Sequence, residues 1–270
     1  MIDPKDRNPV CKLQLQPQYK LRREWEAIAE REGLSYEVQD LFAPPALNES
    51  RLFERYKNWY LRSGRVTSVH GAFIDVNPAS GDLLIRELSR RRCRESCALA
   101  KELGAENIVF HSSCVPFLRG AYLENWAEVC AQFYEELASE YDVQLFIENS
   151  QDIDAKPIKE LMLRIKDPRI GVCLDIGHAG YSRRSLDQWT QELGSWIGYM
   201  HLSDNWGLFD DHRPLGAGIA QLEEADRFWR ESGRMMYMTL EVGGPEGAEQ
   251  SLRYLKKHGL FGMDDGRISQ

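Results

Sequence analysis

The stretch GVCLDIGH (171–178) contains the pattern that decides the fold: a short apolar run leads directly into a carboxylate and a histidine. The pattern recurs along the chain, because five of the six histidines stand at or just beyond the ends of such runs, and glutamates end two others. The other runs are VTSVH (66–70), NIVFH (107–111), LFIE (145–148), YMH (199–201) and MTLE (238–241). Between the last two lies FDDH (209–212), whose Asp210 and His212 have the i, i+2 spacing that places both side chains on one side of an extended segment.

Stretches with helical patterning separate these runs, so the chain divides into eight strand-and-helix units. We expect strands at 12–16, 36–42, 67–73, 107–112, 143–149, 170–177, 196–203 and 236–243. We expect helices at 20–32, 49–61, 82–103, 124–139, 155–165, 185–195, 221–231 and 246–257, several of them followed by glycine. Such alternation is typical of parallel strands joined by crossover helices.

Eight units favour closure into a (β/α)8 TIM barrel over an open, doubly wound α/β sheet. The length of 270 residues suits one barrel domain spanning residues 1–270. No phosphate-binding glycine motif follows the first strand, which argues against a nucleotide-binding, doubly wound α/β fold. The Pro-rich segment APPALNES (43–50) is expected to form a long loop over the barrel mouth.

Composition restricts the class of protein further. The chain has 43% hydrophobic residues, and no apolar run approaches the roughly 20 residues of a membrane helix. The N-terminus shows no signal-peptide core, so we expect a cytoplasmic protein without a membrane partner. Six cysteines without a CxxC pair are expected to be reduced and mostly buried. The net charge of −8 argues weakly against a general polyanion binder.

The strand ends predict a site. A barrel places its active site at the carboxyl ends of its strands, so side chains far apart in sequence meet there. A lone histidine after a strand is more often a structural residue than a metal ligand. When several strand ends carry histidine or carboxylate, a shared metal site becomes the better interpretation. Ligands of this kind without cysteine suit divalent ions, and we expect one to three, with zinc or manganese favoured over cobalt or magnesium. The nine candidate ligands are His70, His111, Glu148, Asp175, His178, His201, Asp210, His212 and Glu241.

The sixth histidine behaves differently. His258 lies in YLKKHGL (254–260), where lysines and a glycine indicate the cationic last turn and cap of a helix. We therefore expect His258 to be structural.

The chain resembles the xylose isomerase-like TIM barrels, a group that holds sugar and sugar-phosphate isomerases and epimerases and, as a branch, the endonuclease IV class of nucleases. The resemblance covers nearly the whole chain. Its motifs are VHGAFID (69–75), CLDIGHAG (173–180), HLSDN (201–205), DHRPLGAG (211–218) and LEV (240–242).

The resemblance implies two metal arrangements. In the epimerase-like members a single ion is held by residues that match Glu148, Asp175, His201 and Glu241, with the match of His178 near the substrate. In the nuclease branch three zinc ions use residues that match all nine candidates. Since all nine are present, the number of ligands favours the nuclease branch.

The loops favour the other branch. The nuclease class carries DNA-contacting loops after its first two strands, whereas this chain has QPQYK (16–20) and the cation-free segment 43–50. The Arg-rich stretch ELSRRRCRES (87–96) is interpreted as the solvated face of a helix. We therefore expect a small-molecule sugar or sugar phosphate as the partner and no nucleic acid, with a homo-oligomer compatible with the sequence. Arg213 lies later than the arginine that the epimerases usually place after the histidine matching His201.

Three functions follow as hypotheses. The first is a metal-dependent isomerase or epimerase of carbohydrate metabolism, in which Glu148 or Glu241 moves a proton and His178 acts beside them. Phe73 and Trp206 could form apolar walls against a sugar ring, and Arg213 could bind a substrate group. The alternative is a multinuclear-zinc phosphodiesterase of the endonuclease IV class. A barrel that only binds a metabolite ranks last, because a binder has little need for nine metal-ligand side chains.

Overall fold

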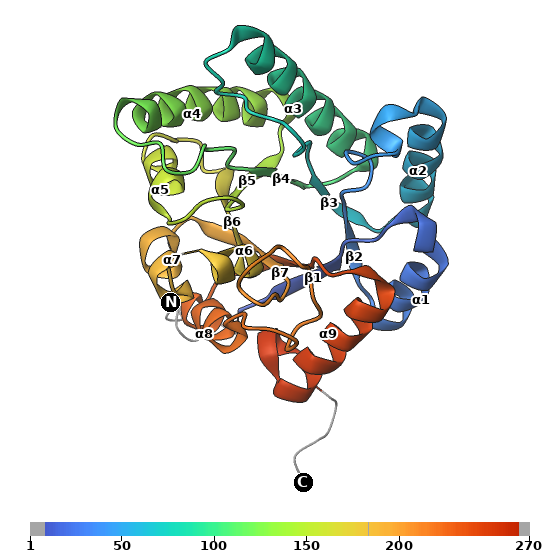
Figure 1. The fold of residues 1–270 in the computed structure, drawn as a ribbon. Helices are drawn as coiled ribbons and strands as arrows, with labels where there is room; N and C mark the ends of the chain where they lie inside the picture. Colours follow the sequence, from blue (N-terminus) through green and yellow to red (C-terminus); the bar gives the residue numbers. More distant parts are fainter. Residues whose placement is uncertain (1–8, 183, 265–270) are drawn as a thin grey trace, which may run out of the picture.

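Eight parallel strands close into a barrel in which each strand pairs with its sequence neighbours and β8 returns to β1. A computed structural model describes residues 9–182 and 184–264. Figure 1 shows the ring of strands surrounded by helices. The strands are β1 (Cys11–Leu15), β2 (Ser35–Val38), β3 (Val66–His70), β4 (Asn107–His111), β5 (Gln144–Glu148), β6 (Ile170–Asp175), β7 (Ile197–Leu202) and β8 (Met236–Leu240). The predicted single TIM barrel is confirmed.

The helices lie on the outside and connect successive strands. They are α1 (Arg22–Glu32), α2 (Ser50–Ser63), α3 (Leu83–Leu103), α4 (Ala121–Tyr141), α5 (Lys156–Met162), α6 (Ile176–Tyr181), α7 (Leu186–Leu193), α8 (Leu222–Ser232) and α9 (Gly244–His258). The predicted stop at Gly104 is confirmed, because this residue ends α3 at φ 73°, a conformation that glycine adopts without a side-chain clash. His258 ends α9 next to Gly259 and packs on Tyr254, as expected of a structural residue.

Helix α6 was not expected. The strand predicted over 170–177 ends at Asp175, whose carboxylate accepts a hydrogen bond from the backbone N–H of His178 at 2.7 Å and so caps α6. The strand predicted over 36–42 is also too long, because β2 ends at Val38 and the apolar Leu41 and Phe42 that follow are buried in a loop.

The expectation that 43–50 forms a loop over the barrel mouth is wrong. Ala46–Asn48 forms a short 3-10 helix that packs on α2 in the outer ring. The cavity beside it is also lined by Arg92 and Glu95 of α3. Ala46 is fully buried in this position.

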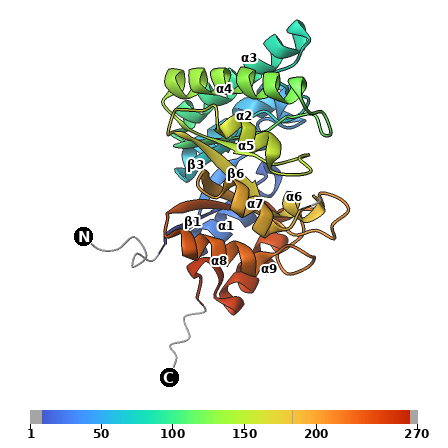
Figure 2. The ribbon, with the colours of Figure 1, turned by 90° about the vertical axis from the view of Figure 1, so that its left-hand side faces the viewer.

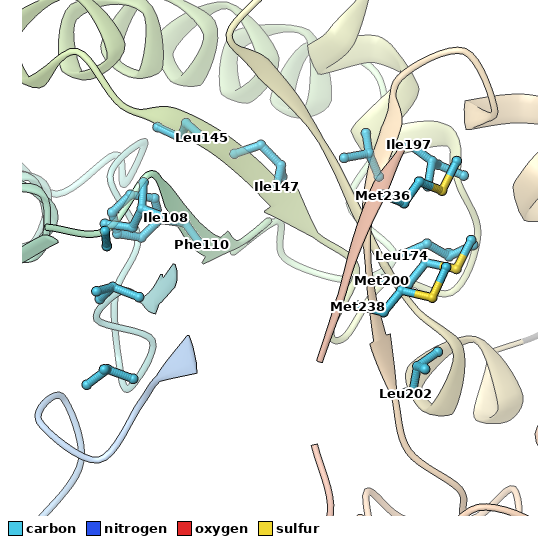
Figure 3. Close-up of a cluster of buried hydrophobic side chains, with 14 of the residues drawn as sticks. Ile108, Phe110, Leu145, Ile147, Leu174, Ile197, Met200, Leu202, Met236 and Met238 are labelled. Carbon is cyan, nitrogen blue, oxygen red and sulfur yellow. The ribbon is translucent and has the colours of Figure 1, made fainter. Parts of the chain in front are cut away.

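The core has two parts because alternate strand residues face opposite sides of the barrel wall. Figure 3 shows part of the larger cluster, with Ile108 and Phe110 of β4 near Leu145 and Ile147 of β5. A smaller cluster is made of the opposite-facing strand residues Val109, Phe146, Cys173, Tyr199 and Tyr237. The site therefore stands on a packed base.

The helices and the cysteines bear on two expectations from the composition. No described helix has the length and apolar character that crossing a membrane would require. All six cysteines are unpaired, and every one except the half-buried Cys11 is buried, as predicted.

Candidate metal centre

Glu148, at the end of β5, lies at the centre of the predicted ring. Its side chain is fully buried, and both carboxylate oxygens face histidines. Oε2 lies 3.2 Å from Nε2 of His70 and 3.6 Å from Nε2 of His111. Oε1 lies 3.2 Å from Nδ1 of His178 and 3.3 Å from Nδ1 of His201. Four strand-and-loop units thus converge on a single carboxylate.

Two groups of side chains have the spacing of metal ligands. Within each group, one potential ligand atom from every residue lies within 4.8 Å of the others. The first group is His70, His111 and Glu148, and the second is Glu148, Asp175, His201 and Glu241. Strand register contributes directly, because His111 pairs with Glu148 and Asp175 pairs with His201 on adjacent strands. Glu148 belongs to both groups.

The donor atoms that face the centre lack hydrogen-bond partners within the described chain. Buried polar atoms are normally paired, and leaving one unpaired costs about 1–3 kcal/mol. Six of the twelve such atoms in the described residues belong to the two ligand groups, and a cation would satisfy these six together. They are His70 Nε2, both oxygens of Glu148, Asp175 Oδ2, His201 Nδ1 and Glu241 Oε2. The residues therefore fit divalent ions.

A third set lies at the rim. Asp210, in the loop between β7 and α8, places Oδ2 3.2 Å from Nε2 of His178 and 3.1 Å from Nε2 of His212. Figure 2 shows this orange loop projecting beside α6, the helix that carries His178. The structure thus brings together all nine residues predicted from the sequence.

Three of the five histidines at the site direct Nδ1 to a backbone carbonyl. Nδ1 of His70 lies 3.0 Å from the carbonyl of Gly71, and Nδ1 of His178 lies 2.7 Å from that of Asn149. Nδ1 of His212 likewise lies 3.1 Å from a backbone carbonyl. These contacts favour protonation at Nδ1 and leave Nε2 for the site. His201 is reversed, because its Nε2 lies 3.1 Å from Glu37 Oε2 and its Nδ1 faces inward.

Burial and neighbouring charges shift the pKa values of the carboxylates in opposite directions. Burial raises the pKa of Asp175 to about 6. Burial alone would also raise the pKa of Glu241, but the facing His201 lowers it to about 2. The pKa of Glu148 is lowered well below its usual value, because His201 and His111 outweigh burial.

The pKa values of the histidines also shift in opposite directions. Burial lowers the pKa of His111 to about 4. Burial would also lower the pKa of His178, but Asp175 and Asp210 raise it well above its usual value. Without an ion the site therefore combines carboxylates with protonated imidazoles, and a cation must displace those protons.

The three predicted substrate contacts separate into two places. Phe73 lies at the site, with its ring centroid 5.1 Å from that of His70 and 5.6 Å from that of His111. Trp206 and Arg213 contact each other, with the guanidinium 3.5 Å from the indole centroid. Trp206 also donates a hydrogen bond to the carbonyl of Ala217, so both residues contribute to the β7–α8 loop.

Phe73 and His111 line a cavity of about 390 Å³ beside the first ligand group. The cavity wall contains apolar side chains, uncharged polar side chains and the carboxylate of Asp75. No lysine or arginine is among the described residues that line it. Its other lining residues are Val76, Asn77, Ser113, Cys114, Val115, Pro116, Ser150 and Gln151.

Sequence reasoning missed the residues that orient the ligands. Gln16 and Gln39 each donate to Glu241 Oε1 at 3.2 Å. Asn149 bonds the backbone of Asp175 on both sides, accepting from its N–H at 2.8 Å and donating to its carbonyl at 3.0 Å. Glu37 contacts His201. The signal in the sequence was a glutamate between the apolar Tyr36 and Val38 in a predicted strand, where alternation places it on the opposite face from both.

The fold and this ring of histidines and carboxylates define a TIM barrel with a candidate metal centre at the carboxyl ends of its strands. The profile of the xylose isomerase-like TIM barrel family matches residues 26–258. The chain belongs to that family.

The chain is also similar to individual proteins. The chain is 27% identical over 202 residues to the uncharacterised protein MJ1311 of Methanocaldococcus jannaschii, covering 70% of this chain and 69% of that protein. The structure of the TTHB071 protein from Thermus thermophilus, solved after soaking with zinc chloride, is 26% identical with a TM-score of 0.74. That match covers 91% of this chain and 97% of the other. A D-tagatose 3-epimerase-like protein is 23% identical with a TM-score of 0.69, covering 83% and 87%.

Proteins of both functional branches share the fold. Solved structures with TM-scores from 0.59 to 0.63 include a D-psicose 3-epimerase from Clostridium cellulolyticum, an L-ribulose 3-epimerase and the endonuclease IV of Thermus thermophilus. At 14–19% identity these likenesses show the fold alone. The fold alone therefore does not identify the reaction, which has to be inferred from the side chains of the site.

Proposed function

We propose that the protein is a divalent-metal-dependent isomerase or epimerase that acts on a small, sugar-like polyhydroxy substrate, with zinc or manganese as the ion. One observation carries the proposal. Glu148 and Glu241, from β5 and the end of β8, belong to the same ligand group, and each has a buried oxygen without a hydrogen-bond partner in the described chain. Two carboxylates on separate strands are suited to moving a proton at a bound substrate.

Glu241 is the stronger candidate for the proton-transfer group. Gln16 and Gln39 occupy Oε1, which fixes the carboxylate and leaves Oε2 to act. His201 lowers the pKa of Glu241 to about 2 against the effect of burial, which keeps this carboxylate ionised at neutral pH. A divalent ion bound by this group would polarise the substrate's oxygens and acidify the adjacent C–H bond.

The cavity beside His111 supports a neutral polyhydroxy substrate. Asn77, Ser113 and Gln151 supply hydrogen-bonding groups suited to hydroxyls, and Phe73 supplies an apolar wall. A phosphate would favour lysine or arginine in such a wall, and the described lining has none. A sugar is therefore favoured over a sugar phosphate. A cytoplasmic location remains a prediction from the sequence.

The test is to incubate the zinc- or manganese-loaded protein with a panel of ketoses and aldoses in deuterated water. We expect deuterium to enter one carbon of at least one sugar, together with formation of its isomer or epimer, as detected by NMR. A panel covering the common pentoses and hexoses that shows no exchange, with metal binding verified, would contradict the proposal.

A second candidate is a multinuclear phosphodiesterase of the endonuclease IV class. Its support is specific: Glu148 is shared by two groups, and Asp210 lies between His178 and His212 as a third set. A mononuclear isomerase leaves that third set without a role. Cleavage of a duplex with a single abasic site, measured on a gel, would favour this candidate.

A further inference from the structure

A buried carboxylate, Glu37, lies directly behind the second ligand group. It belongs to β2 and is fully buried. Its Oε2 accepts hydrogen bonds from the hydroxyls of Tyr199 and Thr239, the latter at 2.7 Å, and lies 3.1 Å from Nε2 of His201. Gln16 donates to Oε1 at 3.4 Å. Since both oxygens already have partners, Glu37 has little capacity left to bind an ion itself.

Glu37 differs from the other groups that orient the histidine rings, because it is a carboxylate and not a backbone carbonyl. His70, His178 and His212 direct Nδ1 to backbone carbonyls, whereas His201 directs Nε2 to this carboxylate. A carboxylate that accepts the N–H fixes the tautomer more strongly than a neutral carbonyl and increases the basicity of the other ring nitrogen.

The inward Nδ1 of His201 faces the ligand group. It lies 2.8 Å from Glu241 Oε2, 3.3 Å from Glu148 Oε1 and 3.9 Å from Asp175 Oδ2. If the proton were on Nδ1, it would point at the position that an ion needs, and the lone pair would be lost to the site.

We infer that Glu37 is a positioning residue that holds the proton of His201 on Nε2 and so makes Nδ1 a metal ligand. The inference rests on the proposed function to the extent that a divalent ion binds between Glu148, Asp175, His201 and Glu241. Glu37 acts through His201 and does not contact the substrate.

The test compares zinc affinity in the whole chain. Glu37→Gln keeps the size of the side chain but removes its charge and introduces N–H donors toward His201, Tyr199 and Thr239. Removing such a partner weakens metal binding about 10- to 100-fold, and we expect that change in Kd, measured by competition with a chromophoric chelator. The matched control is Asp40→Asn, which alters a half-buried carboxylate close in sequence to Glu37. Asp40 accepts hydrogen bonds from the hydroxyl of Tyr60 and the backbone N–H of Tyr19 and belongs to neither ligand group. This control variant should leave the Kd unchanged.

Nitrogen-15 NMR of the histidine rings supplies a readout that is independent of affinity. In the zinc-loaded protein we expect one ring, His201, to carry its proton on Nε2 and bind through Nδ1. In Glu37→Gln this signal should broaden or move to the other tautomer.

If Glu37→Gln fails to fold, Tyr199→Phe provides the test, because it removes one donor and allows the carboxylate to move. The loss of one such bond should weaken zinc binding about 3- to 10-fold.

Two failures can be told apart. Unchanged Kd and an unchanged tautomer in Glu37→Gln, or an unchanged Kd in Tyr199→Phe, would overturn the inference while metal binding by the wild type stands. A wild-type protein that binds no divalent ion would overturn the proposed function and this inference together.

Discussion

At the scale of single residues, chemically identical side chains take different roles. Glu148 has both oxygens directed at histidines, which suits a ligand shared between two ions. Glu241 has one oxygen fixed by amides and one that faces His201 without a hydrogen-bond partner in the described structure, which suits proton transfer. The surroundings of each carboxylate, and not its residue type, set its role.

Glu241→Gln should therefore keep the fold but lower proton exchange at the substrate carbon about 10²- to 10⁴-fold, because an amide cannot cycle a proton. The measurement is deuterium incorporation by NMR. His258→Ala, which alters the histidine at the end of α9, is the matched control and should leave exchange intact. Normal exchange in the Glu241 variant would contradict the assignment.

His212 gives a prediction about pH. Burial alone would lower its pKa, but Asp210 and Glu241 raise it to about 9 in the folded protein. A raised pKa means that protonation stabilises the folded state fully below the unfolded value of about 6.5. That stabilisation is lost as the pH rises toward 9. The melting temperature of the metal-free protein should fall across this window, and His212→Gln should reduce the fall. An equal fall in the variant would count against this role of His212.

Some of these residues could be predicted from the sequence and others could not. Most of the nine ligand candidates could be identified because strand ends of a barrel converge, whatever the details of packing. Asp210 and His212, which lie in the β7–α8 loop, were identified from their i, i+2 spacing. Glu37 and the glutamines could not be assigned, because their roles depend on which ring nitrogen or carboxylate oxygen they face. Phe73 lies at the site as expected, whereas Trp206 and Arg213 pair with each other in a loop whose path the sequence does not specify.

At the scale of elements, hydrogen bonds within the β7–α8 loop hold Asp210 and His212 in place. The carboxylate of Asp204 accepts from the backbone N–H of Gly218 at 2.8 Å and of Ala220 at 2.9 Å, which joins the two ends of the loop. Asn205 ties the loop to α6 by donating to the carbonyl of Gly177. Asp210 and His212 are therefore positioned by contacts outside the metal centre.

If the protein binds a third ion between His178, Asp210 and His212, Asp204→Ala should loosen this loop and release that ion, while ions at the two deeper groups are retained. Metal per chain, measured by elemental analysis after equilibrium dialysis, checks this. Asp226→Asn is the matched control, because Asp226 also fixes a backbone N–H, that of Phe261, far from the site. Unchanged metal content in Asp204→Ala would show that the loop does not position a ligand set.

Element boundaries were predicted less well than element types. The alternation of apolar runs and helical stretches identified every strand. The extension of β6 to residue 177 failed because Asp175 acts as both a strand end and a helix cap, which apolar patterning alone cannot distinguish. The segment 43–50 was misplaced because its proline content indicated a loop without indicating the surface on which it packs.

At the scale of the whole molecule, barrel closure is what concentrates charge at the site. Glu148, Asp175 and Glu241 lie in one ligand group, all buried, with Glu37 directly behind. Like charges in a low-dielectric site destabilise the fold unless cations compensate them. Protonated histidines supply part of that compensation without an ion.

Chelation should therefore lower thermal stability. An ion present at about 100 times its Kd stabilises the folded state by about 2.7 kcal/mol, which corresponds to about 5–10 °C in melting temperature for a chain of this size. Scanning calorimetry before and after exhaustive chelation measures the change, and adding zinc back should restore it. If the melting temperature stays the same after verified metal removal, the metal does not contribute to stability.

The central claim is that strand-end side chains hold divalent ions around Glu148. The most direct measurement is the number of zinc ions bound per chain in the wild type and in Glu148→Gln, determined by elemental analysis after equilibrium dialysis. We predict at least one tightly bound ion per wild-type chain and a large loss in the variant, because both ligand groups include Glu148. A wild-type chain without bound zinc, or a Glu148 variant with undiminished content, would contradict the claim.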